Sequence, residues 1–96
     1  MLFAVLFEDN DHCADARSRH MQEHLDFLSR HASAIKAAGP LRDGAGTAAG
    51  GLWLVEADTT EAVERLVQTD PFWPTGLRRS VRVLAWKQVF AEGKRL

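Results

Sequence analysis

His24 lies at the edge of an apolar helix face, where an ionisable ring could do acid–base chemistry. In the stretch from Arg17 to Ala38, apolar residues recur at the spacing of one amphipathic helix: Met21, Leu25, Leu28, Ala32 and Ile35. At the helical repeat, His24 lies about 40° from Leu28 and about 60° from Met21. Such a histidine is either hydrogen-bonded within the structure or half of an active site, and the helix alone leaves both open. As a residue at the rim of the core, it should cost only about 1–2 kcal/mol of stability when removed.

Asp70 is the candidate partner of His24. Pro71 disfavours helical geometry at Asp70, so the carboxylate comes where the second predicted helix ends. A carboxylate that accepts a hydrogen bond from one imidazole nitrogen fixes the tautomer and makes the other nitrogen a better base. The alternative is an aspartate that only caps the turn before proline.

Other residues are candidates for substrate binding. Arg17, one heptad before His24, and Arg42 could each bind an anionic group through paired N–H donors, or could simply be solvated. Phe72, Trp73 and Trp53 could line an apolar pocket, although aromatic residues more often pack in a core or an interface.

Metal and cofactor motifs are missing from the sequence. Cys13 lies beside His12, Asp11 and Asp15 in a polar loop without the separated ligand pairs of a zinc site or the glycine turn of a calcium site. There is no glycine-rich phosphate loop and no glycine elbow around a serine. We therefore expect neither a metal nor a cofactor.

Composition limits the class of protein. The 96 residues predict one domain, 1–96, with 46% hydrophobic and 26% charged residues and a net charge of −1. No basic stripe is present for nucleic acid.

The apolar run at Leu2–Phe7 is too short to span a membrane and lacks the basic flank of a signal peptide. The single cysteine fits a reducing compartment, so we expect a cytoplasmic protein.

Six elements follow from the apolar patterns. Gly39 and Pro40 are placed to end the first helix, and Asp58, with Glu61, to cap the second. The predicted order is strand Leu2–Phe7, helix Arg17–Ala38, a weak edge arm Leu41–Gly44, a turn Ala45–Gly51, strand Gly51–Ala57, a helix from Asp58 to Asp70, strand Ser80–Phe90, and a polar tail from about residue 91.

This order, β-α-β-β-α-β, predicts a ferredoxin-like α+β fold, a four-stranded antiparallel sheet with two helices on one face. The other face then has no cover. Phe3 or Ala4 with Val5, Trp53, Val55 and residues from 81–90 would leave an apolar surface in water. We therefore expect a homodimer joined through the sheet face.

Three local patterns together resemble the YciI-like (YCII-related) family. They are Arg17 with His24-Leu25, then Ala38-Gly39-Pro40, then Asp70-Pro71-Phe72 with Gly76-Leu77. The resemblance covers Leu2 to about Phe90 and implies a dimeric α+β barrel. It also implies an active site of His24 and Asp70, with Gly39 as the glycine of the helix-ending motif. Gly39, Pro40 and Phe72 thereby join Arg17 and Arg42 as candidate substrate-binding residues. The bulky pair Trp73-Pro74 and the short Gly/Ala turn depart from the family pattern.

The resemblance implies small enzymes, and related barrels include lactone isomerases, dehalogenating enzymes and cofactor-free oxygenases. The leading hypothesis is a cofactor-free enzyme in which His24, oriented by Asp70, transfers protons during isomerisation or elimination on a small organic molecule. The alternative is a non-catalytic dimer that binds a small ligand, or an accessory domain. An open pocket at His24 would favour catalysis.

Overall fold

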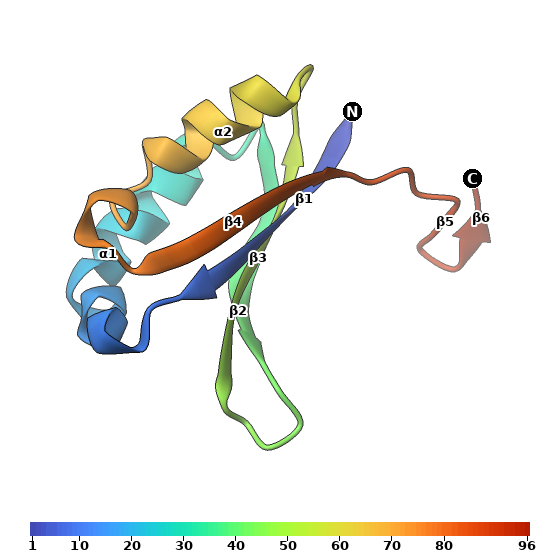
Figure 1. Ribbon diagram of the computed structural model, residues 1–96. Helices are drawn as coiled ribbons and strands as arrows, with labels where there is room; N and C mark the ends of the chain where they lie inside the picture. The colour runs from blue at the N-terminus through green and yellow to red at the C-terminus, as the bar shows by residue number, and fades with distance from the viewer.

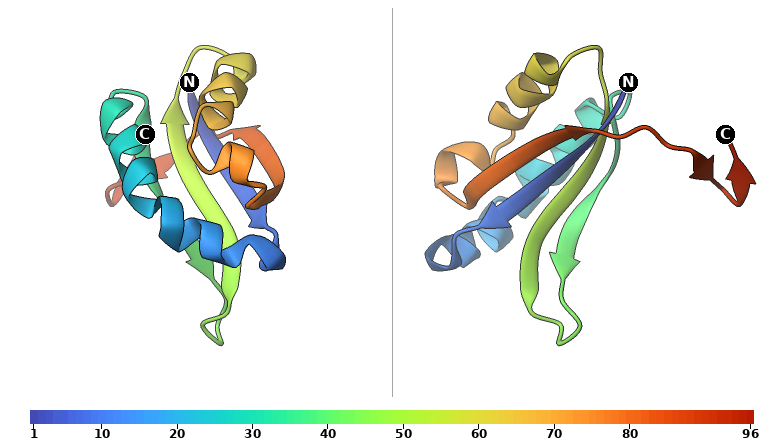
Figure 2. Two further views of the ribbon diagram at one scale, coloured as in Figure 1. Left: turned by 90° about the vertical axis from the view of Figure 1, so that its left-hand side faces the viewer. Right: turned by 45° about the vertical axis from the view of Figure 1, so that its right-hand side comes forward.

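The sheet and its two helices have the predicted ferredoxin-like arrangement. The computed structural model describes residues 1–96, except for the side chain of Ala14. The four-stranded antiparallel sheet has the order β2-β3-β1-β4, with both helices against one face (Figures 1 and 2). The elements are β1 (Leu2–Asp9), η1 (Asp11–Cys13), α1 (Ala14–Arg30), β2 (Ile35–Arg42), β3 (Ala48–Glu56), α2 (Thr60–Gln68), η2 (Trp73–Thr75), β4 (Arg78–Ala85), β5 (Phe90–Ala91) and β6 (Lys94–Arg95).

The core lies between the helices and the inner face of the sheet. On β1, Phe3, Val5 and Phe7 are buried, and they pack with Trp53 and Val55 of β3. Successive side chains of a strand point to opposite faces. The prediction that Val5, Trp53 and Val55 belong to the uncovered face is therefore wrong. The apolar outer face is built from residues that alternate with them.

Helix α1 is shorter than predicted, and a different side of the helix faces the core. It ends at Arg30, and Ile35 already begins β2. The buried side of α1 carries Ala16, His24 and Phe27, whereas Leu25 is 47% exposed. His24 thus lies at the centre of the buried face and not at its rim. The apolar spacing indicates the wrong face because it omits Phe27 and includes Ala32 and Ile35, which lie beyond the end of α1.

Gly39 and Pro40 do not end a helix. They lie in β2, where Gly39 pairs with Leu52 and Pro40 with Gly51 of β3. A proline has no N–H for a sheet ladder, but β2 is an edge strand, so one side needs no partner. A Gly-Pro pair can either end a helix or lie in an edge strand, and Gly39-Pro40 lies in an edge strand.

The N-cap of helix α2 lies one residue later than expected. Thr59 is the N-cap, and its hydroxyl accepts a hydrogen bond of 3.1 Å from the Ala62 N–H, so Asp58 is not the cap. Val63 and Val67 are buried on the predicted face. The helix ends at Gln68, before the Asp70-Pro71 junction, as predicted.

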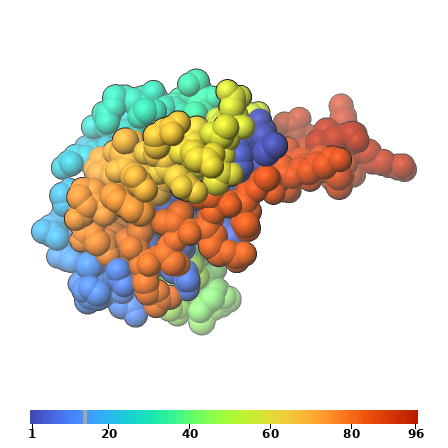
Figure 3. All heavy atoms as spheres, turned by 45° about the horizontal axis from the view of Figure 1, so that its top comes forward, coloured from blue at the N-terminus to red at the C-terminus, as the bar shows by residue number. Residues whose placement is uncertain are grey.

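The C-terminal segment leaves the body of the molecule. The strand predicted for Ser80–Phe90 stops at Ala85, and the residues beyond it form the small β5–β6 hairpin. This segment projects to one side in the ribbon and space-filling views (Figures 2 and 3). Among the described residues, no helix is both long and apolar enough to cross a membrane.

Candidate functional site

His24 and Asp70 meet inside the protein. The Nδ1 atom of His24 lies 2.8 Å from Oδ1 of Asp70, and the two residues are only 6% and 2% exposed. When Asp70 is ionised, its carboxylate only accepts hydrogen bonds, and Nδ1–H is then the donor. The backbone N–H of Phe72 donates to the same oxygen over 3.3 Å. The turn after Asp70 therefore fixes the carboxylate, and the carboxylate fixes the imidazole.

Phe72 holds the plane of the His24 ring. The two rings stack with centroids 4.3 Å apart and an interplanar angle of 21°. Phe72 is fully buried, so this contact limits rotation of the imidazole. The sequence Asp70-Pro71-Phe72 thus supplies both a hydrogen-bond partner and a stacking partner for one histidine.

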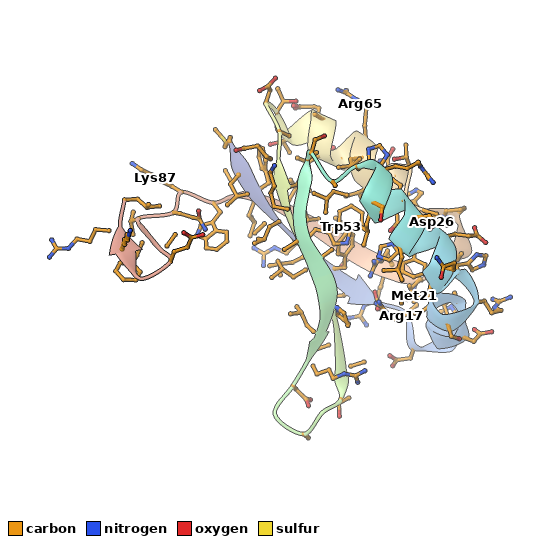
Figure 4. The ribbon with its side chains drawn as sticks, turned by 180° about the vertical axis from the view of Figure 1, so that it is seen from behind. Arg17, Met21, Asp26, Trp53, Arg65 and Lys87 are labelled. Atoms are coloured by element: carbon orange, nitrogen blue, oxygen red, sulfur yellow. The ribbon has the colours of Figure 1, made fainter. Side chains whose placement is uncertain are left out.

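A cavity of about 100 Å³ lies beside His24, between α1 and the β2–β3 hairpin. Trp53, with Arg17 and Met21 of α1, lies in this region between the sheet and the helix (Figure 4). Because Nδ1 is directed at Asp70, Nε2 is the nitrogen available to a ligand. The cavity is lined by Arg17, Met21, His24, Leu25, Leu28, Ala38, Gly39, Pro40, Gly51, Trp53 and Arg78.

Asp9 joins two arginines at the edge of the cavity. Its two oxygens contact Arg17 Nη2 at 2.5 Å and Arg78 Nη1 at 3.0 Å. Burial lowers the pKa of Arg78 from its ordinary value, while the Asp9 carboxylate acts in the opposite direction. Arg78 also lies over the Phe7 ring, with its guanidinium carbon 4.1 Å from the ring centroid. The guanidinium is therefore fixed by a carboxylate and an aromatic face.

The structure brings most of the predicted site residues together. Arg17, Gly39, Pro40 and Trp53 line the cavity with His24, while Asp70 and Phe72 contact the imidazole.

Two predicted residues lie elsewhere. Arg42 is exposed, does not line the cavity, and donates a hydrogen bond of 3.2 Å to the Gly46 carbonyl oxygen in its own turn. Its role in substrate binding stays a prediction. Trp73 is 40% exposed and does not line the cavity.

Sequence reasoning missed Asp9 and Arg78. They are 69 residues apart, and only the antiparallel register of β1 and β4 pairs them. No local pattern could have joined them. Among the described residues there is also no cluster of three or more side chains suited to a metal ion.

Comparison with known proteins relates the chain to a family and to a solved structure. A family model described as a YCII-related domain matches residues 1–87. A similar solved structure is the 5-chloro-2-hydroxyhydroquinone dehydrochlorinase from Burkholderia phenoliruptrix, in complex with 2,5-dihydroxybenzoquinone. The TM-score is 0.80 at 29% sequence identity, over 91% of this chain and 94% of that one. No curated protein sequence matches the chain.

Proposed function

The chain belongs to the YCII-related domain family, and on this premise we propose that it is an acid–base enzyme acting on a small, oxygen-bearing ring compound. In this proposal His24 moves protons and Asp70 holds it in position. The similar dehydrochlorinase supports elimination as the reaction class, since the name describes loss of hydrogen chloride from a substituted hydroquinone.

One observation supports the proposal: His24 lines a cavity while its Nδ1 contacts the buried Asp70, which leaves Nε2 for a substrate. With Nδ1–H donated to Asp70, Nε2 carries the lone pair that a general base needs. The carboxylate also stabilises the imidazolium that forms when Nε2 takes a proton. General acid–base catalysis of this kind contributes about 10²–10⁴-fold in rate.

A dehydrochlorination can proceed through these groups without an external oxidant. Nε2 takes a proton from a ring hydroxyl and returns it to the carbon that bears chlorine, while the oxygen's electrons form a C=O bond. A second hydroxyl then loses its proton and forms another C=O bond as chloride leaves with the C–Cl electron pair. The net loss is one proton and one chloride, and the ring becomes a quinone.

The experiment that tests this proposal follows chloride release and quinone absorbance from 5-chloro-2-hydroxyhydroquinone under anaerobic conditions, which suppress oxidation by air. We expect His24→Gln to lower kcat/KM by about 10²-fold or more, and Asp70→Asn by about 10-fold or more. His12→Gln is the matched control, because His12 is exposed and lies outside the cavity.

Each outcome distinguishes catalysis from the non-catalytic alternative. Turnover that survives His24→Gln in a folded protein would move the active site elsewhere. Binding of the compound without turnover by the unmodified protein would leave a small-ligand-binding domain as the better description.

A further inference from the structure

The wall of the cavity contains two arginines, and the carboxylates that pair with them are not part of the lining. Arg17 and Arg78 line the cavity, whereas Asp9 and Asp70, which face these arginines, do not. A ligand in the cavity would therefore meet guanidinium groups before it meets either carboxylate. Such a wall favours electron-rich oxygen atoms.

Arg78 is fixed in place, but only some of its hydrogen-bond donors have partners. Its side chain is 4% exposed, and it makes one hydrogen bond among the described residues, from Nη1 to Asp9. Its Nη2 atom is 3.9 Å from Asp70, beyond hydrogen-bond distance, and its buried Nε has no partner. A guanidinium has more N–H donors than this single bond uses. Donors therefore remain for a further acceptor.

Gly51 leaves open the space beside this guanidinium. A Cβ atom at position 51 would lie 3.5 Å from Arg78 Nη1 and 3.4 Å from the Gly39 carbonyl oxygen. Gly51 also lines the cavity, and its φ is not positive, so alanine fits the backbone. The absence of a side chain at position 51 thus leaves the space beside Nη1 empty, and the backbone there does not require glycine.

We infer that Arg78 is an anion-recognition residue of this cavity, and that Gly51 is a specificity-determining residue because it keeps Arg78 accessible. The ligand class is a small ring that carries an anionic oxygen, such as a phenolate, an enolate or a carboxylate. Arg17 supplies a second cation at the same wall. The inference rests on the proposed function, but it concerns binding and not proton transfer.

The experiment is a calorimetric titration with 2,5-dihydroxybenzoquinone, whose acidic hydroxyls are vinylogous carboxylic acids and ionise in neutral solution. We expect Arg78→Gln to weaken binding roughly 10- to 100-fold, the loss of one charge-assisted hydrogen bond. Arg79→Gln is the matched control, because Arg79 is exposed and pairs with Glu8 outside the cavity.

A second pair of variants keeps every charge. Gly51→Ala places a methyl group against Arg78 Nη1, and we expect it to weaken binding several-fold or more. Gly44→Ala, in open space outside the cavity, should bind like the unmodified protein. If Arg78→Gln does not fold, the comparison of Gly51→Ala with Gly44→Ala tests the inference by itself.

The inference is overturned if the unmodified protein does not bind the probe at millimolar concentration. It is also overturned if Gly51→Ala, or a folded Arg78→Gln, binds as tightly as its control. Because the readout is affinity, these results are separate from turnover. A His24→Gln protein that binds the probe but keeps its turnover would contradict the proposed function and leave the inference standing.

Discussion

The imidazole of His24 has both a structural and a proposed chemical role. It stacks on Phe72 and donates to Asp70, and its side chain is 8% exposed. Removing the ring would leave a cavity and take one of the hydrogen-bond partners from a buried carboxylate. We expect His24→Ala to lower the free energy of unfolding by about 2–4 kcal/mol, more than its predicted rim position implied. Urea unfolding followed by circular dichroism measures this.

His24→Gln is the variant that separates the two roles, because a glutamine amide can still donate to Asp70. It should retain more stability than His24→Ala while losing the base. A loss below about 1 kcal/mol for His24→Ala would mean that the stacked, hydrogen-bonded geometry is not populated.

How much of the site the sequence predicts depends on whether the residues belong to local patterns. His24 lies on a recognisable helix and Asp70 precedes a proline, so each had a local reason to be considered. Arg78 had none: its role depends on Asp9 and Phe7, at the other end of the chain. Contacts between distant strands follow from register, which the sequence patterns did not fix.

The β1–β3 pairing depends on a close approach at Gly50. Its φ is +95°, and a Cβ atom there would lie 1.8 Å from the Phe7 carbonyl oxygen. We expect Gly50→Ala to lower the free energy of unfolding by about 3 kcal/mol or more, because the two strands must separate. Gly46→Ala is the matched control: φ is +81° but nothing lies within 4 Å, so only the backbone cost of about 1–2 kcal/mol should appear. Equal losses in thermal or urea unfolding would contradict the close approach.

Glu8 of β1 forms hydrogen bonds with Arg79 and Ser80 of β4, and acid should weaken these contacts. Its carboxylate accepts hydrogen bonds from Ser80 and Arg79, and these contacts lower its pKa below the ordinary 4.5. A lowered folded pKa gives stability that is present above the unfolded value and is lost as pH falls through the folded one. We expect the stability advantage of the unmodified protein over Glu8→Gln to shrink below about pH 4.5.

Urea midpoints of both proteins, taken from neutral pH down to about 3, measure this difference. The sign is fixed by the direction of the pKa change. A difference that grew on acidification would mean that Glu8 is held in its protonated form, which its contacts with Arg79 and Ser80 contradict.

At the element scale, the strands and helices were predicted better than their ends. The fold class follows from the order of apolar segments, and the sheet order agrees with it. The boundary between α1 and β2 was wrong because small residues at 32–38 suit either element and Gly39-Pro40 suits either ending. What decides it is the pairing of β2 with β3, which buries Ile35.

The whole molecule has one covered face and one bare face. The helices cover the inner face of the sheet (Figure 2). On the other face, an apolar depression of about 350 Å³ is lined by Ala4, Leu52, Leu54, Leu84 and Trp86. Trp86 directly follows β4, and Val89, Phe90 and Leu96 beyond it are exposed as well. Apolar surface of this kind is unusual on a monomer. We propose that a second copy of the chain covers it, because one face can pair with itself about a two-fold axis.

This proposal predicts a dimer by light scattering at micromolar concentration, and a monomer for Leu54→Glu. Leu54 is partly buried on the bare face, so a dimer would have to enclose the new carboxylate without a partner, which costs several kcal/mol. Ala32→Glu is the matched control, since Ala32 is exposed in the turn after α1 and should not alter the mass. An unmodified monomer with cooperative unfolding, or a Leu54→Glu dimer, would contradict pairing through this face.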